Sequence, residues 1–269
     1  MSEKRRERVF RTEAMVLARM DFGEADRIFT ILTRHRGKMR VIAKGVRRPG
    51  SRLGRNLEYF NLCELMLATG RELDVVAGAE TLERFDQPRE DLDIYGHASY
   101  LSEMLLQMTE DGDESPQTFD LLLRSLRLLC EGIEPFLVTR NFELSLCRIL
   151  GFHPELYRCI SCSEPIEAVT NALSPQLGGM LCPKCRSADH GSMRLSVNAQ
   201  KFIRTLDRGG LAEAIKLRLD ATTANEVERA LHQYARNHAR RDLSSLKVLR
   251  SIHEGLPAGS YDEAYSSTK

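Results

Sequence analysis

The feature that most constrains the fold is a change of hydrophobic period near residue 85. Between residues 10 and 85, short runs are β-branched or alternate between apolar and polar positions, and turn-forming residues separate them. Such runs are typical of strands. The expected strands cover residues 12–19, 27–33, 38–46, 59–68 and 73–82. Because no gap between them is long enough for a helix, the sequence predicts a small, closed or partly closed antiparallel barrel.

After residue 89, apolar positions recur at helical spacing. The expected helices cover residues 89–110, 117–130 and 135–150. Gly151 follows the third of them, at a position where glycine often ends a helix. Thr223 and Glu226 match a capping box, which predicts a further helix from Thr223 to about His238. Strands followed by helices favour an α+β protein or two separate domains over a doubly wound sheet.

A run of positive charge lies inside the predicted barrel. Between Asp26 and Glu58 the sequence has no acidic residue, although the net charge of the whole chain is only +1. The ten cations of this run are Arg27, Arg34, Arg36, Lys38, Arg40, Lys44, Arg47, Arg48, Arg52 and Arg55. A polyanion, either nucleic acid or an anionic membrane surface, would offset their repulsion. A solvated face with scattered charges is the alternative interpretation. The region lacks the amphipathic helix with aromatic anchors that suits a membrane surface, which favours nucleic acid.

The cations are expected to lie on one strand face and on the loop that follows. Lys38, Arg40 and Lys44 alternate with apolar residues, so they should share an exposed face. The loop 45–54 is expected to close over a nucleic-acid strand. The predicted DNA-binding residues are Arg34, Arg36, Lys38, Arg40, Lys44, Arg47, Arg48, Arg52 and Arg55. Guanidinium groups suit this role because they form paired hydrogen bonds to phosphate oxygens.

Aromatic residues are scarce around this run. The chain has no Trp, and only Phe22, Phe29, Tyr59 and Phe60 lie nearby. Some of these side chains are expected to fill the barrel. Small barrels of the OB type bind single strands in a groove and use aromatic side chains as stacking platforms. The scarcity of aromatics therefore favours contacts to phosphates over readout of bases.

A second basic cluster lies at the end of the last predicted helix. Its members are Arg236, His238, Arg240, Arg241, Lys247 and Arg250. Cations near a helix C-terminus interact favourably with the helix dipole, which is one interpretation. The other is a contact to DNA or to an acidic peptide, and the sequence leaves both open.

Four of the seven cysteines have the spacing of a metal site. Cys159, Cys162, Cys182 and Cys185 form two C-x2-C pairs separated by 19 residues, which is typical of a structural zinc site. A full set of four thiolates leaves no open position for chemistry. An iron–sulfur cluster also accepts four cysteines and stays open as an alternative. His153 and His190 flank the four cysteines; they are interpreted as polar loop residues, with spare metal ligands as the alternative. The remaining cysteines are Cys63, Cys130 and Cys147, which are expected to be small buried apolar residues.

No catalytic motif is present, so the sequence favours a binding protein over an enzyme. It has no P-loop, no G-x-G-x-x-G after a strand, no G-x-S-x-G and no H-E-x-x-H. The acidic run 110–114 lacks the ligand spacing of a calcium loop and is interpreted as a solvated helix end. No apolar run approaches the roughly 20 residues of a membrane span, and the charged N-terminus does not resemble a signal peptide. The chain is expected to stay in the cytoplasm.

Several short motifs follow one another along residues 10–252. They lie at 23–33, 37–38, 43–48, 98–103, 142–146, 151–156, 178–179 and 242–246, with the segment 151–156 leading into Cys159–Cys162. Their order and spacing resemble the RecO family of bacterial recombination-mediator and DNA-repair proteins. The resemblance implies an OB-fold domain over 1–85, a helical domain over 86–256 with an inserted four-cysteine zinc module at 156–190, and a flexible tail over 257–269.

The resemblance also implies a function. RecO-like proteins bind single- and double-stranded DNA, anneal complementary strands without ATP-driven chemistry, and work with the partner RecR. Together they load the recombinase RecA onto DNA coated by the single-strand-binding protein SSB, so the expected location is the bacterial nucleoid during repair. The acidic C-terminal tail of SSB is expected to bind Arg236, Arg240, Arg241 and Lys247. Some family members lack the cysteines, which implies that zinc is not needed for the shared activity.

Two alternatives come from other classes of protein. A zinc-ribbon regulator that reads a specific duplex sequence would show a large ratio of specific to nonspecific affinity. A metal-dependent nuclease would use the carboxylates of residues 110–114. Neither implies a small-molecule substrate or a membrane.

Overall fold

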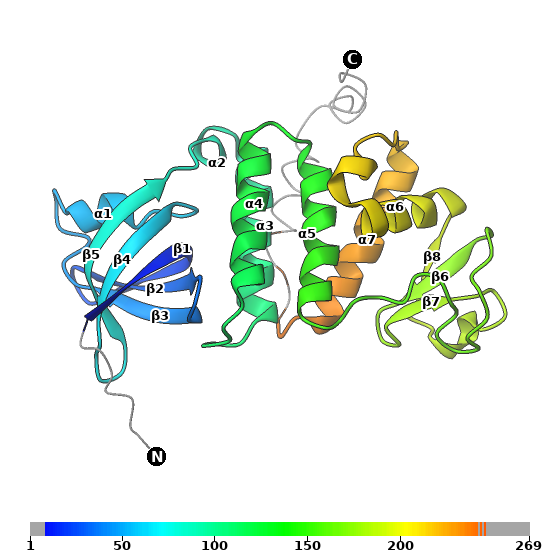
Figure 1. Ribbon diagram of the computed structural model, residues 1–269, viewed down its shortest axis with the longest axis horizontal. Helices are drawn as coiled ribbons and strands as arrows, with labels where there is room; N and C mark the ends of the chain where they lie inside the picture. The colour runs from blue at the N-terminus through cyan, green and yellow to red at the C-terminus, as the bar shows by residue number, and fades with distance from the viewer. Residues whose placement is uncertain (1–8, 242, 244, 246–269) are drawn as a thin grey trace. The chain divides into compact units, whose positions relative to one another are not determined.

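The computed structural model describes residues 9–241, 243 and 245 (Figure 1). The chain forms two compact units, residues 1–131 and 132–269. The predicted domain boundary at 85/86 stays a prediction. The predicted tail, 257–269, lies outside the described residues. Within the part of the chain that is described, no helix is both long and apolar enough to cross a membrane.

A closed barrel of five strands makes up most of the first unit. The strands are β1 (Val9–Phe22), β2 (Asp26–Thr33), β3 (Gly37–Ala43), β4 (Leu62–Ala68) and β5 (Asp74–Glu83). Their order is β1-β2-β3-β5-β4, and β4 pairs back to β1. Every pairing is antiparallel except β3 with β5. The predicted β-barrel and the α+β class are therefore confirmed, but a short helix, α1 (Arg52–Asn56), occupies part of the predicted loop.

Alternation along the strands explains the barrel core. Phe29, Ile31 and Val41 point inward and are almost fully buried, together with Leu65 and Leu67 of β4. Because neighbouring residues point to opposite faces, the residues between them form the outer face. Part of that outer face is also buried, since helix α3 packs against β1.

Three helices complete the first unit. They are α2 (Gln87–Glu90), α3 (Leu92–Met108) and α4 (Pro116–Cys130). The carboxylate of Asp91 accepts hydrogen bonds from the amides of Asp93 and Ile94, so it caps α3 and separates it from α2. Ser115 caps α4 in the same way, through the amide of Thr118. The helices expected over 89–110 and 117–130 are confirmed, with the first of them interrupted at Asp91.

Lys38 is buried, which corrects the expectation that it shares an exposed face with Arg40 and Lys44. Its side chain is only 6% exposed, and Nζ donates to the carbonyl oxygens of Leu106 (2.9 Å) and Thr109 (2.7 Å) at the end of α3. Asp111 Oδ1 lies 3.5 Å from the same nitrogen. The cation thus satisfies carbonyls that a helix end leaves without partners. The alternation on β3 is right, but α3 covers this end of the strand.

The described part of the second unit combines three longer helices with a small sheet. The helices are α5 (Pro135–Ile149), α6 (Val197–Ala214) and α7 (Ala221–His238), and they pack against one another. The strands β6 (Asn171–Ser174), β7 (Gly179–Leu181) and β8 (Met193–Leu195) form an antiparallel sheet in the order β7-β6-β8. Helix α5 was predicted. Helix α6 was not, because Gly209 and Gly210 interrupt its pattern, and Gly210 is non-helical with a φ of 62°.

The start of α7 differs from the predicted capping box. The carboxylate of Asp220, not Thr223, is the cap, and it accepts a hydrogen bond from the amide of Thr223 at 2.8 Å. The carboxylate of Glu226 instead accepts from the amide of Ser196, at the start of α6. The helix was therefore correctly predicted, but the residue that begins it was not.

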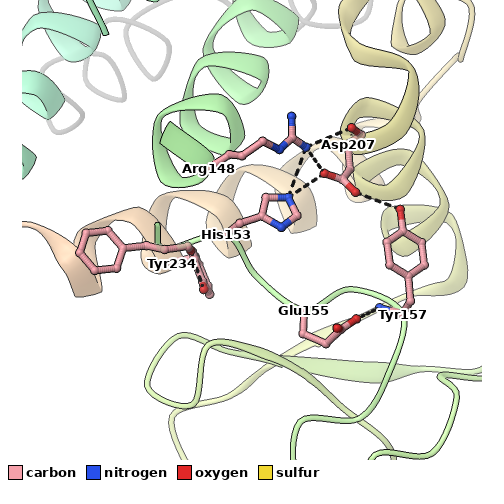
Figure 2. A network of polar contacts seen from close by, with 7 residues as sticks. Arg148, His153, Glu155, Tyr157, Asp207 and Tyr234 are labelled. Carbon is pink, nitrogen blue, oxygen red and sulfur yellow. Dashed lines mark hydrogen bonds and ion pairs between the residues drawn. The ribbon is translucent and has the colours of Figure 1, made fainter. Parts of the chain in front are cut away.

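A buried carboxylate on α6 holds the segment that leads from α5 to the first cysteine pair (Figure 2). Asp207 is 8% exposed; its Oδ2 accepts from the hydroxyl of Tyr157 at 3.0 Å, and its Oδ1 lies 2.7 Å from Nε2 of His153. Arg148 of α5 also pairs with this carboxylate. Burial alone would raise the pKa of Asp207, but the hydrogen bonds from His153 and Tyr157 and the nearby positive charges hold it below its ordinary value. The network fixes the path of residues 151–158.

Replacing Lys38 is expected to destabilise the first unit. Lys38→Met would leave the carbonyls of Leu106 and Thr109 without their donor, at a cost of about 1–3 kcal/mol in the free energy of unfolding. Arg40→Met is the matched control, because Arg40 lies two residues away on the same strand and is exposed. Urea unfolding of the full chain measures both. Equal stability of the two variants would contradict the role assigned to Lys38.

Asp207→Asn is expected to destabilise the second unit in a pH-dependent way. Because the folded state lowers the pKa of Asp207, the carboxylate stabilises the fold above the ordinary pKa of about 4, and this contribution is lost as the pH falls below it. The variant should be less stable by about 1–3 kcal/mol at pH 7, and the difference should shrink toward pH 3. Glu213→Gln, an exposed change on the same helix, is the control. A difference that stays constant with pH would refute the assignment.

Candidate nucleic-acid interface and metal site

The loop after β3 is held against the β1–β2 hairpin. The amide of Arg47 donates to the carbonyl of Ala25 at 2.9 Å, and the amide of Gly45 donates to Oδ1 of Asp26 at 2.7 Å. Further along, Ser51 caps α1 through the amide of Gly54. The loop that was expected to close over a nucleic-acid strand is therefore a series of turns that leads into a short helix. The arginines of this loop therefore extend from a hydrogen-bonded surface next to the hairpin.

About half of the predicted DNA-binding cations already have partners. Arg34 pairs with Glu13 and Asp120, both at 2.6 Å, and its hydrogen bond with Glu13 is the main reason that its pKa is raised. Arg36 lies over the ring of Phe10, with its guanidinium carbon 3.6 Å from the centroid.

Asp21 forms ion pairs with two further cations of the run. Its Oδ1 lies 2.6 Å from Nε of Arg27, and its Oδ2 lies 3.5 Å from Nε of Arg47. Together with the acids that pair with Arg34 and Lys38, it shows that half of the run's charge is engaged in contacts within the fold. The run is free of acids along the chain, but acids from β1 and from beyond the barrel lie next to it in space.

The other five cations of the run remain exposed. Among the residues that the structure describes, none has an acidic partner within 4.0 Å. They are Arg40, Lys44, Arg48, Arg52 and Arg55. Arg40 lies on the outer face of β3, Lys44 and Arg48 lie on the following turns, and the last two lie on α1. This set, which we call the open cations, is the part of the run available to a polyanion.

The aromatic residues near the run separate into buried and exposed. Phe29 and Phe60 are buried, and Tyr59 lies under the guanidinium of Arg19 at 4.7 Å. Phe22 is 51% exposed, and Met20 is 54% exposed two residues before it. The sequence did not single out Met20, and it did not distinguish Phe22 from the other aromatics. A signal was present, because Phe22 directly precedes the turn at Gly23, where a barrel strand ends.

The four predicted metal ligands come together. Their Sγ atoms all lie within 4.8 Å of one another, and Sγ of Cys162 lies 3.9 Å from Sγ of Cys182. Four sulfurs bound to one zinc ion at about 2.3 Å would lie about 3.8 Å apart, so the arrangement fits a single tetrahedral ion. Among the described residues, no other group of His, Cys, Asp or Glu meets the same criterion. The four cysteines could therefore hold a metal ion.

Tight turns direct the thiols inward. The amide of Ser163 donates to the carbonyl of Cys159 at 2.8 Å, and the amide of Cys185 donates to the carbonyl of Cys182 at 3.0 Å. Burial raises the pKa of Cys159, but hydrogen bonds from nearby backbone amides outweigh it and lower the value to about 6. Hydrogen bonds to Glu164 and Ser161 would lower the pKa values of Cys162 and Cys185, but those with the other thiols of the group outweigh them and raise both values. All four thiols must lose their protons to bind a metal ion, because the thiolate is the ligand. His153 lies elsewhere, against Asp207.

The remaining cysteines are not part of this site. Cys63 and Cys147 are buried, and burial raises the pKa of the first to about 11 and of the second to about 12. Cys130 is half-buried, and burial raises its pKa as well. These values are typical of unreactive thiols. The interpretation of Cys63 and Cys147 as buried apolar residues is confirmed, while Cys130 is only partly covered.

The second basic cluster is only partly described. Arg236 lies in the last turn of α7, and Arg240 and Arg241 follow it; all three are exposed. Lys247 and Arg250 lie outside the described residues. The position of these residues at the end of α7 agrees with the helix-dipole interpretation. It does not test the other interpretation, a contact to DNA or to an acidic peptide.

The acidic run 110–114 is exposed and contacts strand β3 of the barrel. Asp111 pairs with Lys38, and the amide of Gly112 donates to the carbonyl of Lys38 at 2.8 Å. A side chain at Gly37 would meet the backbone of Asp113, so the strand and this loop approach closely. These contacts give the run a structural role.

Comparison with known proteins agrees with this geometry. The family described as "Recombination protein O N terminal" matches residues 8–85, and "Recombination protein O C terminal" matches residues 89–247. DNA repair protein RecO of Roseiflexus sp. (strain RS-1) is 39% identical over 255 residues, which cover 95% of this chain and 90% of that protein. DNA repair protein RecO of Symbiobacterium thermophilum is 34% identical over 247 residues, or 91% of this chain and 98% of that protein. The chain therefore belongs to the RecO family of DNA repair proteins.

Proposed function

We propose that this protein binds single- and double-stranded DNA through the open cations of its barrel and acts as a recombination mediator without catalysing a reaction. The observation that carries the proposal is the set of five exposed cations, without acidic partners among the described residues, on β3, on the turns that follow it and on α1. Family membership supports a role in recombinational repair. Lys38 is not proposed as a DNA contact, because α3 covers it; Arg34, Arg36 and Arg47 are proposed as secondary contacts.

Strand annealing follows from the physics of such a surface. Two complementary strands repel each other through their phosphates, and bound protein cations reduce this repulsion by neutralising some of those phosphates. The release of condensed counterions favours this binding. Contacts to phosphates carry no sequence information, so the same surface can hold any pair of complementary strands. Pairing of the bases then supplies the specificity.

We propose that the C-terminal cluster of Arg236, Arg240, Arg241 and Lys247 binds the acidic tail of SSB, and that RecR is a second partner in loading RecA. The exposure of the first three residues supports the SSB contact. Cations attract an acidic segment over a distance of about 10 Å at ordinary salt, which favours recruitment to SSB-coated strands.

We propose that the metal is zinc and that its role is structural. The close spacing of the four sulfurs suits one ion better than a cluster, in which several irons would separate the sulfurs further. The strands of the sheet that carries this module, β6, β7 and β8, are only three or four residues long, so they bury little surface on their own. The thiolates of Cys159, Cys162, Cys182 and Cys185 would then contribute folding energy through the ion.

Reversing three open cations tests the DNA-binding surface. The triple variant Arg40→Glu, Lys44→Glu and Arg48→Glu should weaken binding of a labelled oligothymidine. The plot of log K against log salt should become less steep by about 2. This follows because about 0.7 counterions are released per phosphate contact on a single strand, and three such contacts are lost. Fluorescence anisotropy at several salt concentrations measures both quantities.

The control for this experiment carries the same change of charge elsewhere. Arg71→Glu, Arg84→Glu and Arg124→Glu alter three exposed residues of the same unit. If both triple variants lose the same affinity, the open cations are not the site. Competition with unrelated duplex DNA addresses the regulator alternative, because a large specificity ratio would overturn the proposed mode of binding.

Removing the metal tests the structural role of the cysteines. The purified protein should contain one zinc per chain by elemental analysis, and Cys182→Ser with Cys185→Ser should abolish it. The variant should lose protection from proteolysis within residues 156–190, while oligonucleotide binding by the barrel persists. Cys130→Ser is the control. Iron and visible absorption in place of zinc, or unchanged proteolysis after metal loss, would contradict the proposal.

A further inference from the structure

Two large apolar side chains are exposed at one end of β1. Met20 is 54% exposed and Phe22 is 51% exposed. Single exposed apolar residues are common on proteins and need no explanation. These two lie two residues apart on one strand, so they point to the same side of the sheet. Their neighbours on that side show what kind of surface they form.

The strand register places these residues on the outer face of the barrel. Met20 lies opposite Ile28 on β2, and Ile28 lies opposite Ile42 on β3. An apolar row therefore crosses three strands. Arg40 is two residues from Ile42 and shares its face, opposite Thr30 on β2. The row is thus flanked on one side by an open cation.

Phe22 lies on the other side of this row, beside the turns that carry Lys44 and Arg48. It pairs with Asp26, whose carboxylate accepts the amide of Gly45 at 2.7 Å. The side chain of Arg48 lies over Gly45, since a Cβ placed on Gly45 would be 3.6 Å from Cδ of Arg48. Asp26 is thereby engaged by the backbone, and the register places Phe22 beside a residue that is hydrogen-bonded to the turn carrying Lys44.

We propose that Phe22 is a stacking platform for an unpaired base, while Arg40, Lys44 and Arg48 contact the phosphates on either side of it. Aromatic rings stack on bases of any sequence, and cations beside them follow the backbone. In a duplex the faces of the bases are covered by their neighbours, so this site selects single-stranded DNA. The inference rests on the proposed DNA-binding function and adds the residue that distinguishes single strands from duplexes.

Charge selects nucleic acid over a protein partner as the occupant. The ring lies at the end of the β1–β2 hairpin that is hydrogen-bonded to the turns carrying Lys44 and Arg48. Of the acids in this hairpin, Asp21 is bound by Arg27 and Asp26 accepts from the amide of Gly45, while Glu24 is exposed in the turn itself. A purely apolar partner would leave these cations without compensation in the complex, which is costly when they lose water. A strand with one base on the ring and phosphates on the cations satisfies both kinds of group.

Substitutions at Phe22 separate stacking from general hydrophobicity. Phe22→Ala should weaken oligothymidine binding about tenfold, because stacking of one base contributes about 1–3 kcal/mol. Its affinity for a duplex of equal length and the salt slope should not change, because the cations are retained. Phe22→Leu keeps an apolar side chain without a ring and should resemble Phe22→Ala, whereas Phe22→Tyr should bind as the wild type. Leu92→Ala is the control, since Leu92 is 63% exposed in the same unit.

A spectroscopic variant tests the contact directly. The chain has no Trp, so Phe22→Trp introduces a single fluorophore at the site. Its emission should be quenched when oligothymidine saturates the protein, and much less by a duplex; Leu92→Trp should show no such quenching. Unchanged emission together with wild-type affinity of Phe22→Ala would overturn the inference. If the triple reversal of the open cations still weakens binding in that case, the DNA-binding surface stands and only the stacking role fails.

Discussion

A buried ammonium group organises the first unit. Lys38 ends up at the C-terminus of α3, and its two hydrogen bonds and its ion pair with Asp111 join the barrel to the helices that follow it. A cation in this place both satisfies carbonyls and complements the helix dipole. One end of β3 is therefore closed to ligands, whereas the turns after its other end stay open. The location of the proposed DNA surface depends on this asymmetry.

Contacts within the fold also decide which of the other cations of the run are available to a ligand. A guanidinium that finds a carboxylate on another element, as Arg34 finds Glu13 and Asp120, stabilises the fold and is less available to a phosphate. A guanidinium with no carboxylate near it in the described part of the chain remains available, as those of Arg40 and Arg48 do. Net charge along the sequence therefore overestimates a binding surface. The number of cations that lack an acidic neighbour in space is the better measure of it.

The sequence predicted the elements with strong periodicity, and it missed those decided by distant contacts. The barrel strands, α3, α4, α5 and α7 have clear patterns, and the spacing of the four cysteines identified the metal site. Helix α6 was missed because two glycines interrupt it, and β6–β8 are too short to show a period. The burial of Lys38 was not predictable from alternation, since its partners lie about 70 residues further along the chain.

The segment between α5 and α6 is a long insertion between two helices that pack against each other without it. Helices α5, α6 and α7 contact one another directly, and residues 150–196, including both cysteine pairs, leave from the end of α5 and return at the start of α6. The entropic cost of closing such a loop rises only slowly with its length. Insertions, deletions or loss of the thiols can therefore accumulate in this segment during evolution while the packing of the three helices is kept.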